Sequence, residues 1–209
     1  MAHARVYNDY VIERFAPYFS RLCPTAPVPI TDIDEAVAEI ERVAAGGFRA
    51  ILLPAIPPIP YYSRDLDPVW AAAQANGVHV FIHTQTGGVK VNDPTSTTLR
   101  VVMESAAQVN QPITEKSASK RMITQCIYGP MVPQQVLCEL IGGGVPERYP
   151  DLHFALIEFN AHWLASLMGS MDKCWVTGIG QDADWWLGYW DDARPANDQP
   201  NMAQLFKLN

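Results

Sequence analysis

The 209-residue sequence lacks several features that would place it in a class of protein at once. No apolar run approaches the roughly 20 residues that span a bilayer, and the N-terminus has no apolar signal-peptide segment. Basic residues are the minority, with 15 Lys and Arg against 22 Asp and Glu and a formal net charge of -7. Because phosphate binding needs a basic surface, the composition favours a small-molecule partner over nucleic acid or a membrane.

Paired cysteines and the common catalytic motifs are also missing. The four cysteines are widely spaced and form no CxxC pair, which predicts reduced thiols in a cytoplasmic protein and neither a disulfide framework nor a zinc knuckle. The sequence has no GxSxG, Walker or HExxH motif. Residues 142–144 are three glycines that follow no strand, so they indicate the end of a helix and not a phosphate loop.

The sequence does contain an alternation of helical and strand patterns. Residues 31–47 predict a helix, because Thr31 or Asp32 can cap it and Gly46 and Gly47 can end it. A strand follows, then a helix that begins at Asp67-Pro68 and ends at Asn76-Gly77, and then a second strand. The two strands start about 30 residues apart, which is typical of a parallel βαβ unit.

Four segments read as buried strands, around residues 22–28, 48–53, 78–83 and 152–157. Strands that are apolar throughout are buried on both faces, as in a parallel sheet, so the fold class is α/β. A closed (β/α)8 barrel has eight strands and usually about 250 residues. We therefore expect one domain over residues 1–209 with a partial, TIM-barrel-like sheet that does not close.

Two chemically useful side chains stand at the carboxyl ends of these strands, where α/β proteins place their sites. His83 ends the third strand and could be a metal ligand, a general base, or a residue that caps the strand by bonding a loop carbonyl. Glu158 ends the fourth strand. We expect it either to lose solvent there and act in proton transfer, or to bond backbone N–H groups of the next helix.

Three further segments could contribute to binding or assembly. The polar stretch "TQTGG" after His83 predicts a flexible loop, and Asn160 and His162 follow Glu158 in another loop. His162 could also be a solvent-facing residue at the start of a helix. Residues 185–190 contain three tryptophans and a tyrosine, which predict a packing or subunit surface of a homo-oligomer more than a sugar platform.

Three stretches together resemble one family: "DIDEAVAEIERVAAGGFRAILLP", "DLDPVWAAAQANGVHVFIHTQTGG" and "GVPERYPDLHFALIEFNAHWLASLMGSMD". They are similar to the amidohydrolase-2 group of metal-dependent hydrolases, which includes aminocarboxymuconate-semialdehyde decarboxylase and related aromatic acid decarboxylases. The resemblance covers about residues 7–172. It implies a distorted (β/α)8 barrel that holds one divalent metal, commonly zinc, with His83 as a ligand. Glu158 stands where some members carry a catalytic histidine and many carry glutamate.

The sequence departs from this family at both ends. The HxH pair of the first strand has no counterpart, because His3 stands alone, and the chain reaches Asn209 without the family's aspartate strand. The resemblance therefore implies a domain truncated at both ends. A catalytic metal needs about three protein ligands, so we expect weak metal binding and little turnover if this chain acts by itself.

These observations lead to three hypotheses. The first is a metal-dependent hydrolase or non-oxidative decarboxylase that acts on a small carboxylated or cyclic substrate. It would use His83 as metal ligand, Glu158 as catalytic carboxylate, and as substrate contacts Thr84, Gln85, Asn160 and His162. The second is a catalytically inactive partial barrel that serves as a structural or oligomerisation module. The third is a metal-free glycosidase, for which the sequence offers no second strand-end carboxylate.

Overall fold

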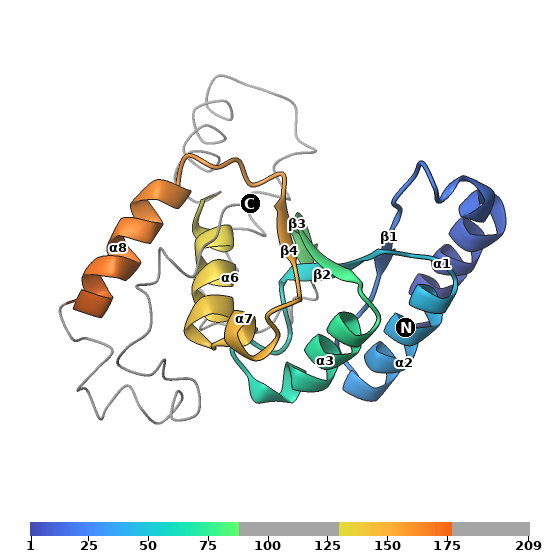
Figure 1. Cartoon of the computed structure of the whole chain (residues 1–209), viewed down its shortest axis with the longest axis horizontal. Coiled ribbons are helices and arrows are strands. Elements are labelled where there is room, and N and C mark those ends of the chain that lie inside the picture. The colour runs from blue at the N-terminus through green and yellow to red at the C-terminus, as the bar shows by residue number, and fades with distance from the viewer. Residues whose placement is uncertain (88–129, 177–209) are drawn as a thin grey trace, which may run out of the picture.

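The computed structural model describes residues 1–87 and 130–176 (Figure 1). The helices in these ranges are α1 (Ala2–Phe15), α2 (Ile33–Ala45), α3 (Asp67–Ala75), α6 (Met131–Gly142), α7 (Val145–Arg148) and α8 (Leu164–Val176). Two short 3-10 turns are η1 (Ala16–Tyr18) and η2 (Arg64–Leu66). The strands are β1 (Thr25–Pro27), β2 (Ala50–Ile56), β3 (His79–Gly87) and β4 (Phe154–Ile157).

The four described strands form one parallel sheet in the order β1-β2-β3-β4 (Figure 1). Ala50 of β2 pairs with His79 of β3, and Val80 of β3 pairs with Phe154 of β4. This confirms the predicted α/β class and the partial sheet, which is not closed into a barrel within the described residues. In such a sheet all carboxyl ends lie at one edge, which is where a site is expected.

Helix α2 shows how local sequence signals define one element. The Asp32 side chain accepts a hydrogen bond from the Glu35 N–H at 2.9 Å, which satisfies an otherwise unpaired donor of the first turn. The helix ends at Gly46, and Gly47 has a φ of 100°, a backbone conformation that glycine adopts without steric cost. The predicted cap and stop residues are therefore confirmed.

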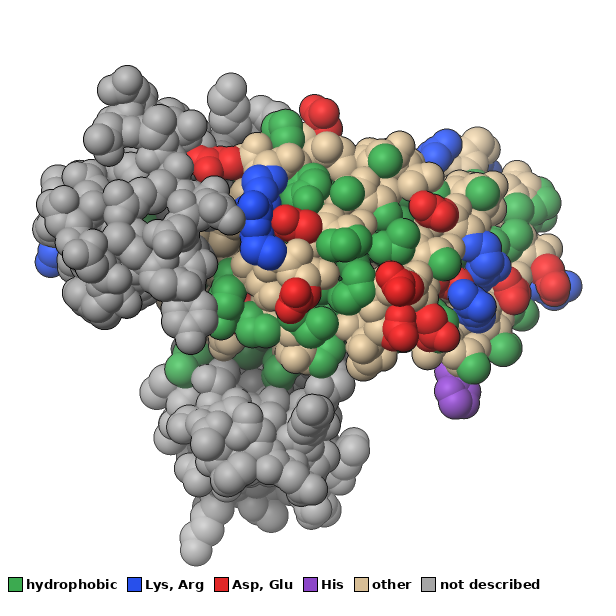
Figure 2. Space-filling model, turned by 90° about the horizontal axis from the view of Figure 1, so that it is seen from below, with side chains coloured by type: hydrophobic (Ala, Val, Ile, Leu, Met, Phe, Trp, Pro, Cys, Tyr) green, Lys and Arg blue, Asp and Glu red, His purple; other side chains and the backbone are tan. Residues whose placement is uncertain are grey.

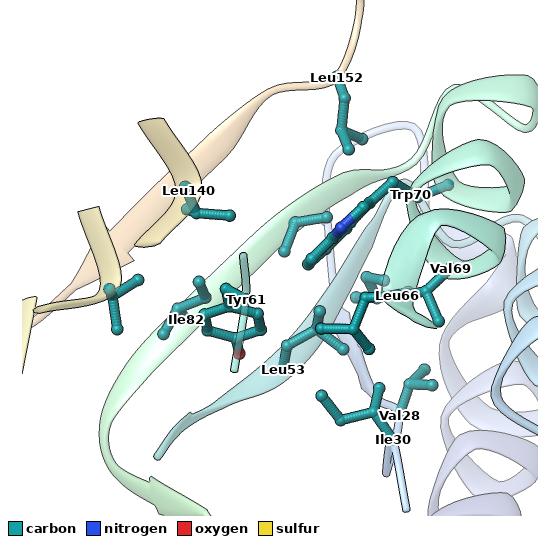
Figure 3. Close-up of a cluster of buried hydrophobic side chains, with 14 of the residues drawn as sticks. Val28, Ile30, Leu53, Tyr61, Leu66, Val69, Trp70, Ile82, Leu140 and Leu152 are labelled. Atoms are coloured by element: carbon teal, nitrogen blue, oxygen red, sulfur yellow. The ribbon is translucent and has the colours of Figure 1, made fainter. Parts of the chain in front are cut away.

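The core lies between the sheet and the helices that cover one of its faces (Figure 3). Leu53 of β2 and Ile82 of β3 point towards the side chains that cover this face of the sheet. These side chains are Tyr61 from the segment after β2, Trp70 of α3 and Leu140 of α6, and all five residues are almost fully buried. Each apolar side chain of this size contributes about 1.5–3 kcal/mol when it leaves water. The adjacent strand positions point to the other face, where Pro54 and His83 are only half-buried.

Strand β3 continues past His83 to Gly87, so the prediction of a loop at "TQTGG" is wrong for its first four residues. The Thr86 hydroxyl accepts a hydrogen bond from the Ala55 N–H at 2.9 Å and donates one to the His83 carbonyl at 2.5 Å. The bond from Ala55 connects β2 to β3 where the register shifts between Pro54 and Ile56. A side-chain hydroxyl thus replaces a regular backbone pair at this irregularity.

Other boundaries differ slightly from the predictions. β1 is shorter than expected, and the first helix begins at Ala2. Asp67 is the first residue of α3 and not its cap, because η2 leads directly into the helix. Gly144 follows α6 with a φ of 62°, which agrees with the predicted helix end at 142–144. Two further segments lie outside the described residues: residues 97–108, whose sequence has a helical pattern, and the aromatic segment 185–190.

The surface of the described part carries charges of both signs. On the face shown in Figure 2, acidic and basic side chains are interspersed with apolar ones, and neither sign forms one large patch. Among the described residues, no helix has the length and apolar character that crossing a membrane requires.

Candidate functional site

Two side chains meet at the carboxyl edge of the sheet. His83 of β3 pairs in register with Pro54 of β2 and with Ile157 of β4, and Glu158 is the residue that follows β4. The pairing of β3 with β4 therefore brings His83 and Glu158 side by side, although 75 residues of sequence separate them. The His83 Nε2 and the Glu158 Oε2 are 3.5 Å apart.

The hydrogen bond on the other side of the imidazole determines what His83 can do. Its Nδ1 lies 2.7 Å from the Thr84 carbonyl oxygen, which can only accept, so Nδ1 carries the proton. In the neutral ring Nε2 then keeps its lone pair, and this is the atom that faces Glu158. His83 thus bonds a nearby carbonyl, as one hypothesis expected, and still presents a free ligand atom.

Glu158 is held in an unusual backbone conformation. Its φ is 64°, in the left-handed region that costs a residue with a side chain about 1–2 kcal/mol. The next residue, Phe159, is buried, and the Trp163 Nε1 donates to the carbonyls of Phe159 at 2.9 Å and Asn160 at 3.2 Å. Burial of these two rings fixes the turn and leaves Glu158 on the outside. Such strain often accompanies a functional site.

The expectation that Glu158 loses solvent is wrong. Its side chain is 69 % exposed, whereas that of His83 is 34 % exposed. The reason is that β4 ends at Ile157 and Phe159 takes the buried position that follows. The alternative, a carboxylate bonded to N–H groups of α8, is not observed either, since its polar contact in the described chain is with His83.

Of the proposed substrate contacts, Thr84 bonds to His83 through its backbone carbonyl. Thr84 is half-buried in β3 and offers its carbonyl to His83, while for Gln85 the structure describes the backbone in β3 only. Asn160 and His162 are exposed in the turn between β4 and α8. Within the described residues, no polar contact joins Asn160 or His162 to His83.

Three residues that support the site were missed by the sequence reasoning. Thr86 fixes the backbone of His83, while Phe159 and Trp163 fix the turn that carries Glu158. A threonine in a polar stretch gives no signal of this role. The four-residue spacing of the two aromatic rings in "EFNAHW" was the one available hint, because such a pair can pack across one helical turn.

The geometry of the pair suits a shared metal ion, but two ligands do not complete a metal site. Nitrogen and oxygen ligands at about 2.0–2.2 Å around a tetrahedral zinc ion stand roughly 3.3–3.5 Å apart, which matches the His83–Glu158 separation. The part of the chain that the structure describes holds no group of three or more His, Cys, Asp or Glu that could bind a metal. The His83–Glu158 pair alone therefore falls short of the three or so protein ligands that a catalytic metal requires.

Comparison with known proteins shows the family of this chain. The sequence matches the family described as Amidohydrolase over residues 1–208. This chain belongs to the amidohydrolase family. Among proteins of curated function, none matches it. The resemblance seen in the three sequence stretches is confirmed by this match over nearly the whole chain.

Solved structures with the same fold include two proteins that are named as an amidohydrolase and a decarboxylase. The amidohydrolase is from Mycobacterium avium subsp. paratuberculosis K-10, with 20 % identity, a TM-score of 0.63, and coverage of 94 % of this chain and 48 % of that one. The 2,6-dihydroxybenzoate decarboxylase from Rhizobium has 16 % identity, a TM-score of 0.57, and coverage of 97 % and 55 %.

A third solved structure is the IDCase of Metarhizium anisopliae in its apo form. It shares 18 % identity and a TM-score of 0.63, and the match covers 96 % of this chain and 47 % of that one. The chain thus spans about half the length of the solved structures that it matches. At these identities the likeness is one of fold.

Proposed function

We propose that this chain carries part of the active site of a metal-dependent hydrolase or non-oxidative decarboxylase. The observation that supports this proposal is the free His83 Nε2 facing the Glu158 Oε2 at 3.5 Å, at the carboxyl edge of an amidohydrolase-family sheet. The substrate is a small carboxylated or cyclic molecule. The name of the Rhizobium neighbour, a 2,6-dihydroxybenzoate decarboxylase, favours an aromatic carboxylate.

His83 is the metal ligand in this proposal. Metal-binding histidines usually donate their second ring N–H to a carbonyl or carboxylate, and the Nδ1 bond to Thr84 is of this kind. The metal, zinc by family resemblance, would polarise the substrate or lower the pKa of a bound water. Because Glu158 is reserved for proton transfer in this proposal, at least two further ligands must come from outside the described residues.

Glu158 holds or moves a proton at Oε2, the oxygen that faces His83. Hydrolysis requires a base that accepts a proton from water, and decarboxylation requires an acid that protonates the carbon losing carbon dioxide. An exposed carboxylate with a single polar neighbour can perform either transfer. Thr84 and Gln85 on β3, and Asn160 and His162 in the turn after β4, are the substrate contacts of this proposal.

A second candidate is a catalytically inactive partial barrel that assembles with copies of itself. Two observations favour it: the incomplete ligand set of the described residues, and the large apolar side chains exposed on α1. Val6, Tyr7 and Tyr10 are all more than half exposed on this helix. Exposed apolar surface of this kind is typical of a contact between subunits.

Elemental analysis of the purified chain separates the two candidates. We expect zinc in the purified chain, with one equivalent lost in His83→Ala and none lost in His3→Ala, because His3 is exposed on α1 far along the chain from the site. A folded, oligomeric protein without metal would contradict the first candidate and favour the second.

A Glu158→Gln variant then tests the carboxylate. It should keep its metal but lose at least about 100-fold in carbon dioxide release from 2,6-dihydroxybenzoate, since general acid–base catalysis contributes 10²–10⁴-fold. Unchanged turnover would remove Glu158 from the proposed mechanism.

A further inference from the structure

A second pair of histidines stands at the opposite edge of the same two strands. His79 is the first residue of β3, and His153 immediately precedes β4. Val80 pairs with Phe154, and the Val80 N–H donates to the His153 carbonyl at 2.9 Å, so the two histidines lie side by side across the strands. Both are exposed, with ring centroids 5.3 Å apart and ring planes at 88°.

The ring of His153 is already oriented as a ligand. Its Nδ1 lies 3.1 Å from the Asp151 carbonyl, so Nδ1 carries the proton and Nε2 keeps its lone pair. This is the arrangement in which metal-bound histidines are usually held. The His79 ring makes no hydrogen bond among the described residues, which leaves both of its nitrogens open to a ligand.

The separation of the rings suits one shared ion. Two imidazoles whose nitrogens lie about 2.0–2.1 Å from one metal, at an angle of 90–110°, place their ring centroids roughly 4.5–5.3 Å apart. The observed 5.3 Å falls at the upper end of this range, and the rings, which now stand edge to face, would turn about their side-chain bonds to aim one nitrogen each at the ion. We propose that His79 and His153 form a two-histidine site for a divalent transition-metal ion such as Zn²⁺, with water as the remaining ligands.

This site is separate from the one at His83. His83 is four positions beyond His79 in extended strand, which is about 13 Å along β3. An ion at His79 and His153 would connect β3 with β4, and hence the two described ranges, which residues 88–129 separate in sequence. Because the unfolded chain does not hold these rings together, binding would stabilise the fold by mass action.

The test is a Zn²⁺ titration of the full chain without an affinity tag, carried out on a His83→Ala background. The His83→Ala substitution removes the proposed catalytic ligand. Zn²⁺ binding to this variant therefore reports on the His79–His153 site alone, whether or not the His83 hypothesis is correct. The titration is repeated with His79→Asn, with His153→Asn and with both. His3→Asn, at another exposed histidine, is the matched control.

We expect each single substitution to weaken the same binding event by at least about tenfold, and the double substitution to add little, because both rings hold one ion. The rise in melting temperature with Zn²⁺ should disappear in the same variants and persist in His3→Asn. Zn²⁺ binding and stabilisation that survive in His79→Asn or His153→Asn would overturn the proposal and leave the pair as an edge-to-face packing contact.

Discussion

Two glutamates of this protein, Glu39 and Glu158, differ in burial and in the number of their polar partners. Glu39 on α2 is fully buried and bonds Arg42 at 2.7 and 2.9 Å, Arg5 at 3.0 Å and Asn8 at 2.8 Å. Glu158 is 69 % exposed, and its polar neighbour among the described residues is His83, at 3.5 Å. The Glu39 carboxylate uses its hydrogen-bond acceptor sites within the fold, whereas the Glu158 carboxylate keeps most of its acceptor sites for a ligand.

The surroundings of Glu39 favour its charged form. Burial opposes ionisation of this carboxyl, but hydrogen bonds from Arg42, Asn8 and Arg5 outweigh it, and the pKa of Glu39 lies below its ordinary 4.5. The bond to Glu39 likewise raises the pKa of Arg42, with a smaller contribution from Asp9. A buried ion pair is tolerated only when bonds of this kind replace the lost water.

The Glu39 cluster is structural because of what it connects. Arg5 and Asn8 come from α1, and the Asn8 amide also donates to the Pro27 carbonyl at the end of β1 at 3.2 Å. The cluster therefore joins α1, α2 and β1, which lie side by side (Figure 1). A buried, saturated carboxylate thus serves stability, while an exposed and unsaturated one at a strand end is available for chemistry.

The largest effect should come from removing the buried carboxylate. Glu39→Ala removes one of the two acceptors of the Asn8 amide, the counter-charge of Arg5, and one of the two counter-charges of Arg42. Loss of one partner of a buried pair costs about 3–5 kcal/mol, but Arg5 and Arg42 are 44 % and 35 % exposed and can turn to water. We expect the free energy of unfolding, measured in urea, to fall by roughly 2–3 kcal/mol. Glu41→Ala, at an exposed position of α2, should change it by less than about 0.5 kcal/mol.

The next effect is on acid stability. Because the pKa of Glu39 is lower in the folded state, the stability it provides is complete above about pH 4.5 and is lost as the pH falls through the folded-state pKa. The difference in unfolding free energy between the wild type and Glu39→Gln should therefore be largest near pH 7 and shrink towards pH 3. A difference that stays constant over urea titrations from pH 7 to pH 3 would mean that Glu39 acts only through packing.

Much of the fold follows from local signals in the sequence. The cap at Asp32, the glycines after α2 and the 30-residue spacing of two apolar strands predicted the βαβ unit, since each depends on neighbouring residues only. His83 and Glu158 could be placed at one edge because parallel strands share their carboxyl ends. The family match then confirmed the fold class.

Features that depend on distant partners could not be predicted in this way. Glu39 bonds residues 31 and 34 positions away, so the burial of this charged side chain has no local signal. The extension of β3 to Gly87 depends on the Thr86 hydroxyl meeting β2. The exposure of Glu158 depends on Phe159 and Trp163 taking the buried places next to it. In each case tertiary packing overrides the local pattern.

The smallest expected change in unfolding free energy is at Glu158, and its sign is opposite to that of Glu39→Ala. It is therefore the most direct test of the contrast between the two glutamates. Glu158→Asn places a residue that tolerates the left-handed conformation where glutamate is strained, so the unfolding free energy should rise by about 0.5 kcal/mol while activity falls. Glu158→Gln keeps the strain and removes only an exposed contact, so it should leave stability within about 0.5 kcal/mol of the wild type. Urea unfolding of both variants measures this difference. If both instead lost stability as Glu39→Ala does, the His83–Glu158 pair would be a second structural cluster, and its strained backbone would have no connection with function.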